Sequence, residues 1–414
     1  MKTYQVGGSV RDKLLGLASV DRDYVVVGAT PEQMTVAGFM PVGKDFPVFL
    51  HPVTNEEYAL ARTERKSGRG YTGFTFHTSI DVTLEEDLQR RDLTINAMAL
   101  DESGAVVDPY GGQRDLASKT LRHVSDAFAE DPLRVLRLAR FAARFTEFHV
   151  APETMALCKA LVDQGEIAEL VPERVWQEVS RGLMEAQPSK MFDLLRECGA
   201  LAVLSPELNR LWGVPQPEKW HPEIDTGIHI MQVVDYAAAK GWPLATRFAA
   251  LTHDLGKGDS PAATWPAHHG HEVRSVMHVE ALSARWKVQR DVADLARIVA
   301  AEHGNLGKLA AMRPATVHDV LMRCDAIRRP ERFVQVLDAC EADKSSRRAV
   351  GLPESAGVAY AERMDAMNAL AAMQSVDAGA VASALSATPE RIAGAVREAR
   401  IAAIRELRGD LTDE

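Results

Sequence analysis

Two carboxylates stand two positions apart where an apolar segment begins. Asp21 and Asp23 open a β-branched run that ends at Gly28. This run predicts a buried strand, and side chains at positions i and i+2 of a strand point to the same face. Carboxylates that project together suit Mg²⁺, which proteins commonly hold with one or two carboxylates and the phosphates of a substrate. The pair therefore predicts magnesium-dependent chemistry on a phosphate group.

A glycine pair and an arginine precede these carboxylates. Gly7 and Gly8 favour a turn whose backbone N–H groups can approach a phosphate, and Arg11 can neutralise its charge. With magnesium bound, such a site could activate an attacking hydroxyl and stabilise a leaving pyrophosphate. We expect Glu57, in another predicted strand, to supply a third carboxylate. An isolated Asp-x-Asp is usually a solvated turn, but this combination favours a catalytic set made of Asp21, Asp23 and Glu57.

A helix predicted after Pro132 carries a row of arginines: Arg134, Arg137, Arg140 and Arg144. At about 100° per residue they cover about a third of the helix circumference, with apolar residues on the other side. Pro132 favours a helix start, with Asp131 near the N-cap. A solvated charged face is the alternative, but such a face usually mixes signs and this one is purely cationic.

Asp131 and Arg134 lie one turn apart and can act as a pair. A carboxylate accepts from an exocyclic amino group, and a guanidinium donates to ring nitrogens and carbonyl oxygens. Cytosine and adenine both present an amino group beside a ring acceptor, whereas guanine and uracil present a keto group there. The pair could therefore accept CTP and ATP and reject GTP and UTP without a nucleic-acid template.

A basic, glycine-rich stretch, TERKSGRGY, occupies residues 63–71. One interpretation, which depends on the family resemblance given below, is a mobile loop that assists a switch from addition of C to addition of A. The other is an ordinary surface loop, and the two are equally compatible with the sequence.

Histidines gather in the middle of the chain beside an aspartate. His253 and Asp254 stand in the run LTHDLGKG, His229 lies upstream and Asp325 downstream. An adjacent His-Asp pair at a helix end can hold one metal ion, and a distant histidine and aspartate can close the site. Imidazole and carboxylate suit a transition metal, Mg²⁺ or Mn²⁺, which can activate water for phosphate-ester hydrolysis. A single His-Asp pair is usually structural, but HDLGK with an upstream helical histidine is more specific.

Composition limits the class of protein. The chain of 414 residues is 46% hydrophobic and 26% charged, which is ordinary for a globular protein of two to four domains. We find no apolar run of about 18 residues and no signal-peptide pattern, so no membrane segment is expected. Four scattered cysteines predict neither a disulfide framework nor a zinc site, which favours a reducing, cytoplasmic location. The net charge of −10 argues against a general polyanion binder, so positive charge for a nucleic acid must be concentrated locally.

The residue composition and spacing change near residue 125. Strand and turn signals precede it, whereas Ala, Leu, Arg and Glu at helical spacing follow it. Strands are expected at 23–27, 46–50 and 57–61, and 94–100 fits either a strand or a short helix. We expect an α+β protein with a small α/β head and an all-α body. Its four segments are a head (1–125), a helical neck and body (126–217), a histidine-bearing domain (218–330) and a helical tail (331–414).

The head resembles the nucleotidyltransferase domain of the DNA polymerase beta superfamily, in its bacterial class II tRNA nucleotidyltransferase branch. The motifs that carry this resemblance are Gly-Gly-x-x-Arg-Asp at 7–12, Asp-x-Asp at 21–23, RRDLTINA at 90–97, DPYGG at 108–112 and EDPLR at 130–134. The resemblance implies that Arg91 and Asp92 lie near the sugar and phosphates of the nucleotide. It implies that Asp131 and Arg134 select the base. The expected nucleotide-binding set is Gly8, Arg11, Arg91, Asp92, Asp131, Arg134, Arg137 and Arg140.

The middle domain resembles the HD phosphohydrolase superfamily. That resemblance implies a ligand set of His229, His253, Asp254 and Asp325 for a divalent transition metal such as Ni²⁺, or for Mg²⁺. Either His268 or His269 could add a ligand or a phosphate contact, whereas His278 and His303 are expected outside the ligand set. With the stretch WHPEIDTGIH at 220–229, the chain resembles the bacterial multifunctional CCA-adding enzymes over essentially its whole length.

This resemblance implies an enzyme that adds and repairs the 3′-terminal CCA of tRNA from CTP and ATP, without a template and with release of pyrophosphate. It also implies that the HD domain hydrolyses phosphomonoesters and 2′,3′-cyclic phosphates. The expected partners are tRNA, CTP and ATP, with no membrane, and the chain is expected to be a monomer or homodimer. The tail at 331–414 could bind tRNA or could serve only for packing.

Two other functions compete with this interpretation. A bacterial poly(A) polymerase shares the head, but such enzymes usually lack the HD domain and carry a basic C-terminal extension. Here the C-terminal residues 409–414, GDLTDE, are acidic. A nucleotide-sensing or RNA-binding protein with an inactive head is the second, and it is disfavoured because both Asp21 and Asp23 are present.

Overall fold

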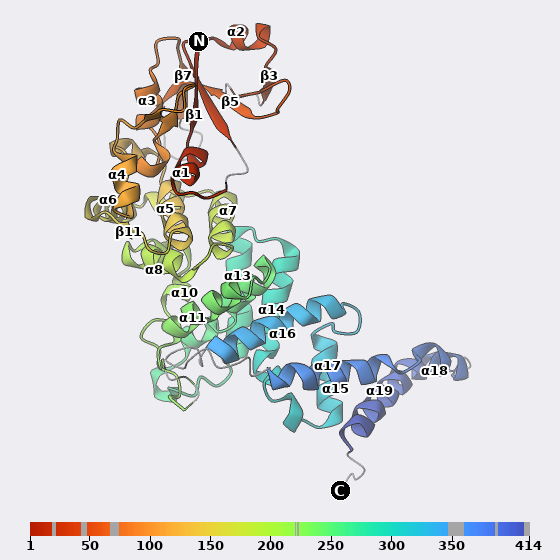
Figure 1. The fold of residues 1–414 in the computed structure, drawn as a ribbon. Coiled ribbons are helices and arrows are strands. Elements are labelled where there is room, and N and C mark those ends of the chain that lie inside the picture. Colours follow the sequence, from red (N-terminus) through yellow and green to blue (C-terminus); the bar gives the residue numbers. More distant parts are fainter. Residues whose placement is uncertain are drawn as a thin grey trace. The chain divides into compact units, whose positions relative to one another are not determined.

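A computed structural model describes residues 1–18, 22–42, 48–66, 74–219, 221, 223–346, 360–385 and 388–409. The chain forms two compact units (Figure 1). Unit 1 comprises Met1–Gly182 and Lys190–Leu204, and unit 2 comprises Leu183–Ser189 and Ser205–Glu414. The boundaries of the four segments expected from the sequence remain predictions.

Unit 1 begins with a small sheet accompanied by short helices. In chain order its elements are β1 (Lys2–Val6), α1 (Gly8–Leu14), β2 (Asp23–Val27), α2 (Pro31–Val36), β3 (Met40–Val42), β4 (Val48–Leu50), β5 (Glu57–Leu60), β6 (Arg62–Lys66), β7 (Phe74–Thr78), α3 (Leu84–Gln89), the 3-10 turn η2 (Thr94–Asn96), β8 (Ala99–Leu100), β9 (Val106–Val107), α4 (Gly112–Ala117) and β10 (Thr120–Leu121).

The sheet brings two of the expected catalytic carboxylates together. Its strand order is β3-β4-β5-β2-β1-β8-β9, and β2 runs parallel to β5 while the other neighbours are antiparallel. In this register Val6 of β1 pairs with Asp23 of β2, and Asp23 pairs with Glu57 of β5. Strands β6 and β7 form a separate antiparallel hairpin. Asp23 and Glu57 therefore begin two neighbouring parallel strands at the same edge of the sheet.

Both faces of this sheet are covered. Val25 packs in a cluster with Leu84 and Leu88 of α3, whereas Val26 packs with Met34 of α2 and Phe49 of β4. Successive strand residues point to opposite faces, so the two valines serve two separate layers of core. Burial on both sides holds β2 in place, and Asp23 at its first position is exposed.

The rest of unit 1 is mainly helical. It contains the 3-10 turn η3 (Asp126–Glu130), α5 (Leu133–Arg144), β11 (His149–Val150), α6 (Pro152–Asp163), the 3-10 turn η4 (Glu166–Glu169), α7 (Pro172–Leu183), α8 (Ser189–Glu197) and α9 (Ala200–Leu204). Helix α5 carries the arginine row and buries its other side, including Val135, Leu136 and Ala139. This apolar stripe holds the helix against unit 1 and leaves its arginines toward a cavity.

Among the described residues of unit 2, the regular elements are helices and 3-10 turns joined by loops. Its elements are α10 (Pro206–Asn209), α11 (Thr226–Ala239), α12 (Leu244–Thr252), the 3-10 turns η5 (Leu255–Asp259) and η6 (Ala262–Thr264), α13 (His271–Trp286), α14 (Arg290–Leu306), the 3-10 turn η7 (Leu309–Ala311), α15 (Pro314–Arg323), α16 (Pro330–Ser346), α17 (Ala361–Gln374), α18 (Ala378–Ala384), the 3-10 turn η8 (Pro389–Arg391) and α19 (Ile392–Arg408).

Small residues bring the central helices of unit 2 together. Ala237 of α11, Ala250 of α12 and Ala342 of α16 lie in one buried cluster with Val233. Helix α12 also packs on α14, and α13 packs on α14 and η5. Four helices, α11, α13, α14 and α16, therefore meet around the junction of α12 and η5, where His253 and Asp254 stand.

The α+β class predicted from the sequence is confirmed by a small sheet followed by helices. The segment 94–100, which fitted a strand or a helix, contains both: the turn η2 and the strand β8. The basic stretch 63–71 was expected to be a loop, but residues 63–66 belong to β6, and residues 67–71 lie outside the described residues. Among the described helices, we find none that combines the length and the apolar character needed to cross a membrane.

A test of the head's packing is Gly112→Ala. A Cβ at Gly112 would stand 2.4 Å from the backbone oxygen of Thr94 and 2.7 Å from Cγ of Met98, so α4 would have to move from η2. Overpacking of this kind costs about 1–3 kcal/mol. We expect the free energy of unfolding to fall by that amount in urea titrations of the full chain. Gly394→Ala, in exposed α19 with no neighbour within 4 Å, is the control and should be neutral or slightly stabilising. Equal effects of the two changes would contradict this packing.

Candidate active sites

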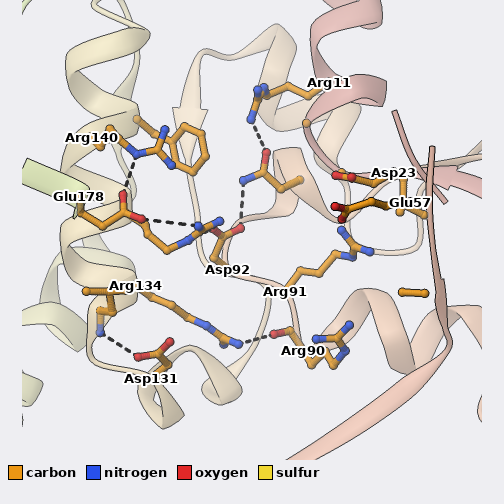
Figure 2. A pocket seen from close by; sticks show the side chains of 18 of the residues that line it. Arg11, Asp23, Glu57, Arg90, Arg91, Asp92, Asp131, Arg134, Arg140 and Glu178 are labelled. Atoms are coloured by element: carbon orange, nitrogen blue, oxygen red, sulfur yellow. Dashed lines mark hydrogen bonds and ion pairs between the residues drawn. The ribbon is translucent and has the colours of Figure 1, made fainter. Parts of the chain in front are cut away.

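A cavity of about 730 Å³ lies in unit 1 beside the carboxylate edge of the sheet. Figure 2 shows Asp23 and Glu57 on one wall, Arg91 between them and the floor, and the side chains of α5 on the opposite wall. Of the expected catalytic set, the structure thus brings Asp23 and Glu57 together. Asp21 lies outside the described residues.

A glycine makes room at this wall. Gly7 has φ +74°, the left-handed region that favours glycine, and it directly precedes α1, which begins at Gly8. A Cβ at Gly7 would stand 3.1 Å from Nη1 of Arg91 and 4.0 Å from Oδ2 of Asp23. The absence of a side chain therefore keeps open the space in front of the carboxylates. Hard oxygen ligands at the rim of such a space fit a divalent cation that also contacts phosphate.

Asp92 is the buried anchor of the cavity floor. Its Oδ2 accepts hydrogen bonds from Nε and Nη2 of Arg137 at 2.9 and 2.7 Å, and its Oδ1 accepts from Nδ2 of Asn96 at 2.9 Å. Burial acts to raise the pKa of Asp92, but Arg137 and Asn96 outweigh it and hold that pKa well below its usual range. Asp92 is therefore ionised, and its contacts are with protein groups that line the cavity.

Arg11 is held by protein groups as well. Its Nη1 donates to Oδ1 of Asn96 at 2.6 Å, and its Nε donates to Oδ1 of Asp12 at 2.8 Å. Arg144 of α5 reaches the other oxygen of Asp12 at 2.9 Å. The Arg11 guanidinium also lies about 5 Å from the ring centroids of Phe141 and Phe145 (5.2 and 5.1 Å). The expected phosphate contact of Arg11 therefore requires it to share or exchange these partners.

The proposed base-selecting residues lie on the same wall but have separate partners. Oδ1 of Asp131 accepts the N–H of Leu133, the first residue of α5, at 3.1 Å, and Oδ2 accepts from Nη2 of Arg174 at 2.8 Å. Arg134 is buried and donates to the carbonyl oxygens of Ala127 and Arg90, both at 2.7 Å. These bonds fix the position of both side chains at the edge of the cavity.

Helix α7 also lines the cavity, a contribution that was not predicted from the sequence. Arg174, Gln177, Glu178 and Arg181 all line the cavity, at spacings of three and four residues that place them on one face of the helix. Glu178 accepts from Nε of Arg140 at 2.7 Å and lies 3.8 Å from Nη1 of Arg137 (Figure 2). The periodic polar stripe in residues 172–183 was a usable signal, but the same stripe is typical of a solvated helix face.

The second candidate site lies in unit 2. Nε2 of His229 is 3.0 Å from Oδ1 of Asp343, Nε2 of His253 is 3.7 Å from that oxygen, and Nε2 of His253 is 3.2 Å from Oδ2 of Asp254. Ligand atoms around a cation at about 2.1 Å are spaced by about 3.0–3.5 Å. The separations of 3.0 and 3.2 Å lie in this range and that of 3.7 Å slightly exceeds it, so the group is compatible with one metal ion. His229, His253 and Asp254 are almost fully buried.

Neighbouring groups orient these ligands. Oε1 of Glu223 lies 2.8 Å from Nδ1 of His229, and Nδ1 of His253 is 2.9 Å from the carbonyl oxygen of Ala250. Contacts of this kind leave Nε2 to face the metal position. Nε2 of His253 makes no hydrogen bond within the described part of the chain. Burial acts to lower the pKa of His253, but Asp254 and Asp343 outweigh it and raise that pKa to about 10, so the field here favours positive charge.

Asp325 does not join this cluster, which corrects the expected ligand set. It stands in the turn between α15 and α16 with φ +57°, and its carboxylate pairs with Arg328 at 2.9 Å and Arg329 at 3.6 Å. The carboxylate that meets His229 is Asp343, near the end of α16. Asp343 reaches His229 because the small residues of α16 allow its last turns to pack against α11 and α12.

The structure also places the other histidines that were considered from the sequence. His268 is buried, with Nε2 2.7 Å from the carbonyl oxygen of Pro215, and His269 is exposed. His278 pairs with Asp259, as expected for a residue outside the ligand set. His303, which was expected outside the ligand set, lies with His271 and Asp254 in one of the three groups of described residues that could hold a metal ion. Trp220 and Pro222 of the motif at 220–229 lie outside the described residues.

Three family models match successive parts of the chain. The poly A polymerase head domain matches residues 3–122, a model described as a probable RNA- and SrmB-binding site of polymerase A matches 147–211, and the HD domain matches 226–343. The chain is 59% identical over 415 residues to the Multifunctional CCA protein of Cupriavidus metallidurans, covering 99% of both chains. It is 57% identical to that of Herminiimonas arsenicoxydans, covering 98% of this chain and 97% of the relative.

Solved structures share the fold. One described as a CCA-adding enzyme with CTP has a TM-score of 0.62 at 19% identity, covering 100% of this chain and 88% of the other. The Thermotoga maritima CCA-adding enzyme complexed with tRNA has a TM-score of 0.61 at 19% identity, with the same coverage. Fold and domain content together define a nucleotidyltransferase head joined to an HD domain. Within that class, the chain belongs to the multifunctional CCA protein family, and the resemblance drawn from its motifs is confirmed.

The buried pair of Asp92 and Arg137 gives a stability test. Arg137→Ala leaves Asp92 buried without its two-pronged donor, a change that typically costs about 3–5 kcal/mol in a fully buried pair. The Arg137 side chain is 35% exposed, so solvent screening lowers our expectation to about 2 kcal/mol in urea unfolding. Arg181→Ala, an exposed arginine in the same cavity, should change the free energy of unfolding by no more than about 0.5 kcal/mol. If the two variants are equally stable, Arg137 does not anchor Asp92.

Proposed function

We propose that this chain adds the 3′-terminal CCA to tRNA from CTP and ATP. The observation that carries the proposal is one cavity with Asp23 and Glu57 on one wall and Asp131, Arg134 and Arg174 on the other. Carboxylates for a metal and groups for a base are thus within reach of one nucleotide. The relatives named for CCA, at up to 59% identity over the full length, support the same function. Structures that share the fold are described with CTP, ATP and tRNA.

The transfer joins the 3′ oxygen of the RNA to the α-phosphorus of the nucleotide. As that P–O bond forms, the bond between the α-phosphorus and the bridging oxygen of the β-phosphate breaks, the hydroxyl proton is released and pyrophosphate leaves. We propose that Asp23 and Glu57, with Asp21, hold Mg²⁺, which would activate the hydroxyl and stabilise the leaving group. The arginines of α5 and Arg91 balance the charge of the phosphates, and Gly7 and Gly8 let the backbone approach them.

Selection of the base rests on the wall formed by α5 and α7. Asp131 offers a carboxylate to the amino group that cytosine and adenine share, and Arg134 offers donors to their ring acceptors. Arg174 holds Asp131 at 2.8 Å, and the bonds of Arg134 to Ala127 and Arg90 hold the guanidinium. These supports keep the two recognition groups at a fixed spacing, so the protein itself acts as the template.

We propose that the cluster of unit 2 hydrolyses phosphomonoesters and 2′,3′-cyclic phosphates. His229, His253, Asp254 and Asp343 would hold a divalent metal such as Ni²⁺ or Mg²⁺, which would activate water toward the phosphorus. Water adds to the phosphorus, the ester P–O bond breaks, and the leaving oxygen takes up a proton. Lys257 stabilises Asp254 through Nζ, 2.6 Å from Oδ2, and donates to Gln216 at 2.5 Å.

The proposal also covers the location of the protein, its oligomeric state and the role of its C-terminal tail. The cytoplasm is the proposed location, and the oligomeric state is proposed to be a monomer or homodimer. In the tail, Arg397 pairs with Asp319 of α15, and Arg408 donates to the carbonyl oxygens of Leu309 and Met312. These contacts give the tail a packing role, and we propose that its remaining surface contacts tRNA.

The nucleotidyltransferase assignment predicts a specific product. Incubated with tRNA that lacks CCA, CTP, ATP and Mg²⁺, the chain should restore an end that can be aminoacylated. Glu57→Gln and Asp23→Asn should each slow this by at least about 100-fold, because metal-held charge is worth several kcal/mol in the transition state. Glu102→Gln, an exposed acid in a turn of the head, is the control. A long A tail would favour the poly(A) polymerase alternative, and no addition would refute the proposal.

The hydrolase assignment predicts that the two activities separate. His253→Ala combined with Asp254→Ala should lower hydrolysis of 2′,3′-cyclic nucleotides at least about 100-fold, beyond the effect of losing groups that only orient ligands. CCA addition by the same variant should be unchanged. The matched control is His278→Ala with Asp259→Ala, another His-Asp pair in unit 2 that lies outside the cluster. Joint loss of both activities in the first variant would show that the sites are not independent.

A further inference from the structure

Three buried polar side chains, those of Gln216, Lys257 and His268, lie next to the proposed hydrolase cluster of unit 2. Nζ of Lys257 is 2.6 Å from Oδ2 of Asp254 and donates a hydrogen bond to Oε1 of Gln216 at 2.5 Å. Nε2 of His268 is 2.7 Å from the carbonyl oxygen of Pro215, the residue before Gln216. Each of the three residues has at most 8% of its surface exposed. They form a polar layer that reaches the cluster through the Asp254 carboxylate.

The contacts of Gln216 and His268 determine which of their atoms remain available. An ammonium group can only donate, so the amide atom of Gln216 that faces Lys257 is the oxygen, and the other amide atom is the donor Nε2. A carbonyl oxygen can only accept, so Nε2 of His268 carries a hydrogen and donates it to Pro215. Burial lowers the pKa of His268, and the nearby Lys257 acts in the same direction, so the ring is neutral. Its Nδ1 then carries a lone pair and is an acceptor.

These two available atoms have no partner in the described part of the chain. Nε2 of Gln216 and Nδ1 of His268 are both buried, and neither makes a hydrogen bond there. A buried donor or acceptor that stays unsatisfied costs about 1–3 kcal/mol. His268 also has φ +50°, in the left-handed region that is uncommon for a residue with a side chain. An orphaned donor and an orphaned acceptor in one polar layer indicate that a ligand supplies the missing partners.

A hydroxyl group has the hydrogen-bonding capacity that this pair requires. It can donate to Nδ1 of His268 and accept from Nε2 of Gln216 at the same time. An oxygen of a phosphate or a carboxylate could only accept, and it would face the lone pair of His268. The group that binds at these two atoms is therefore a neutral O–H, although Asp254, on the other side of Lys257, belongs to a proposed site for phosphate.

We propose that Gln216 and His268 bind the ribose hydroxyl that neighbours the phosphate ester of a ribonucleotide. This inference rests on the proposed hydrolase function of unit 2. Opening a 2′,3′-cyclic phosphate leaves a phosphomonoester on one ribose oxygen and a hydroxyl on the adjacent carbon. The subsite therefore recognises the product of the first hydrolysis as the substrate of the second. Because neither atom is open to solvent, the side chains around the subsite must give way as the ribose enters.

Substrates that lack one hydroxyl test the subsite in the full chain. Adenosine 2′- and 3′-monophosphates are each compared with the analogue in which hydrogen replaces the neighbouring hydroxyl. For the isomer that is hydrolysed faster, we expect kcat/KM to exceed that of its deoxy analogue at least about 30-fold, because loss of the hydroxyl leaves two buried groups unpaired. A buried water has the same hydrogen-bonding capacity as a hydroxyl. Equal kcat/KM values would show that a water only occupies the subsite, which overturns the proposal.

Two variants test the residues themselves. Gln216→Glu keeps an oxygen for Lys257 but replaces the Nε2 donor by an acceptor, and His268→Asn removes the ring acceptor with a residue that tolerates the left-handed backbone. In either variant we expect the ratio of the two kcat/KM values to fall below about 5. His278→Asn, a matched change on α13, should keep the parental ratio.

The ratio separates recognition from a merely structural role. A structural role would lower hydrolysis of both substrates equally and leave the ratio unchanged, which would refute the proposal. Gln216→Glu decides the result if His268→Asn does not fold, as judged by circular dichroism.

The outcome is separable from the proposed hydrolase function. If the metal-loaded chain hydrolyses none of these substrates, that function is refuted, and binding is measured by isothermal titration calorimetry. The Kd of the monophosphate should then be at least about 10-fold lower than that of its deoxy analogue in the parent but not in Gln216→Glu, since binding in the head is common to both proteins. Hydrolysis without any preference for the hydroxyl would refute the subsite and support the hydrolase function.

Discussion

The need to neutralise a buried carboxylate, that of Asp92, determines how the helices of unit 1 are arranged around the cavity. Asp92 cannot be ionised in the floor of the cavity unless a cation and hydrogen-bond donors compensate its charge. Arg137 supplies the positive charge and two donors, and the neutral amide of Asn96 supplies a further donor. Asn96 also accepts a hydrogen bond from Arg11, and Glu178 contacts both Arg137 and Arg140. The result is a continuous network through α1, η2, α5 and α7. Because every member needs its neighbour, the helices that line the cavity are held in register with the sheet that carries Asp23 and Glu57.

Buried carboxylates must also be neutralised in unit 2, but there the neighbouring groups are different. There Asp254 and Asp343 are placed among imidazoles rather than guanidinium groups. Imidazole nitrogens can be donors or ligands, so the negative charge of the carboxylates can be balanced by a proton or by a metal. The guanidinium network of unit 1 offers no such choice, since arginine does not lose its proton. One unit is therefore built for a nucleotide held by fixed charges, and the other for exchangeable cations.

Sequence reasoning reached the parts of these sites that local patterns encode. The α+β class, the strand after Asp23 and the arginine helix all follow from runs of a few residues. Glu57 could be nominated because it begins a strand, and the parallel register of β2 and β5 then places it beside Asp23. Asp343 could not be found in this way, because it lies in a helix with Asp338 and Glu341 and resembles a solvated acidic face. Asp325 follows a helix, as His253 and Asp254 do, yet its carboxylate pairs with Arg328. Only the packing of α16 on α11 distinguishes the two aspartates.

The paired state of the cavity arginines has a consequence for what can bind there. Asp12, Asp92 and Glu178 are tethered anions at high effective concentration, and they compete with any anion that enters. A single inorganic phosphate replaces one such partner and gains little. A triphosphate with a metal ion engages several cations at once, which is the arrangement that overcomes several tethered competitors together. Under the proposed function, we expect the tethered anions to pair with the arginines again once the phosphate chain is cut, which would favour release of pyrophosphate. The ion pairs of the cavity would then select a ligand by the number of its charges before the base is selected.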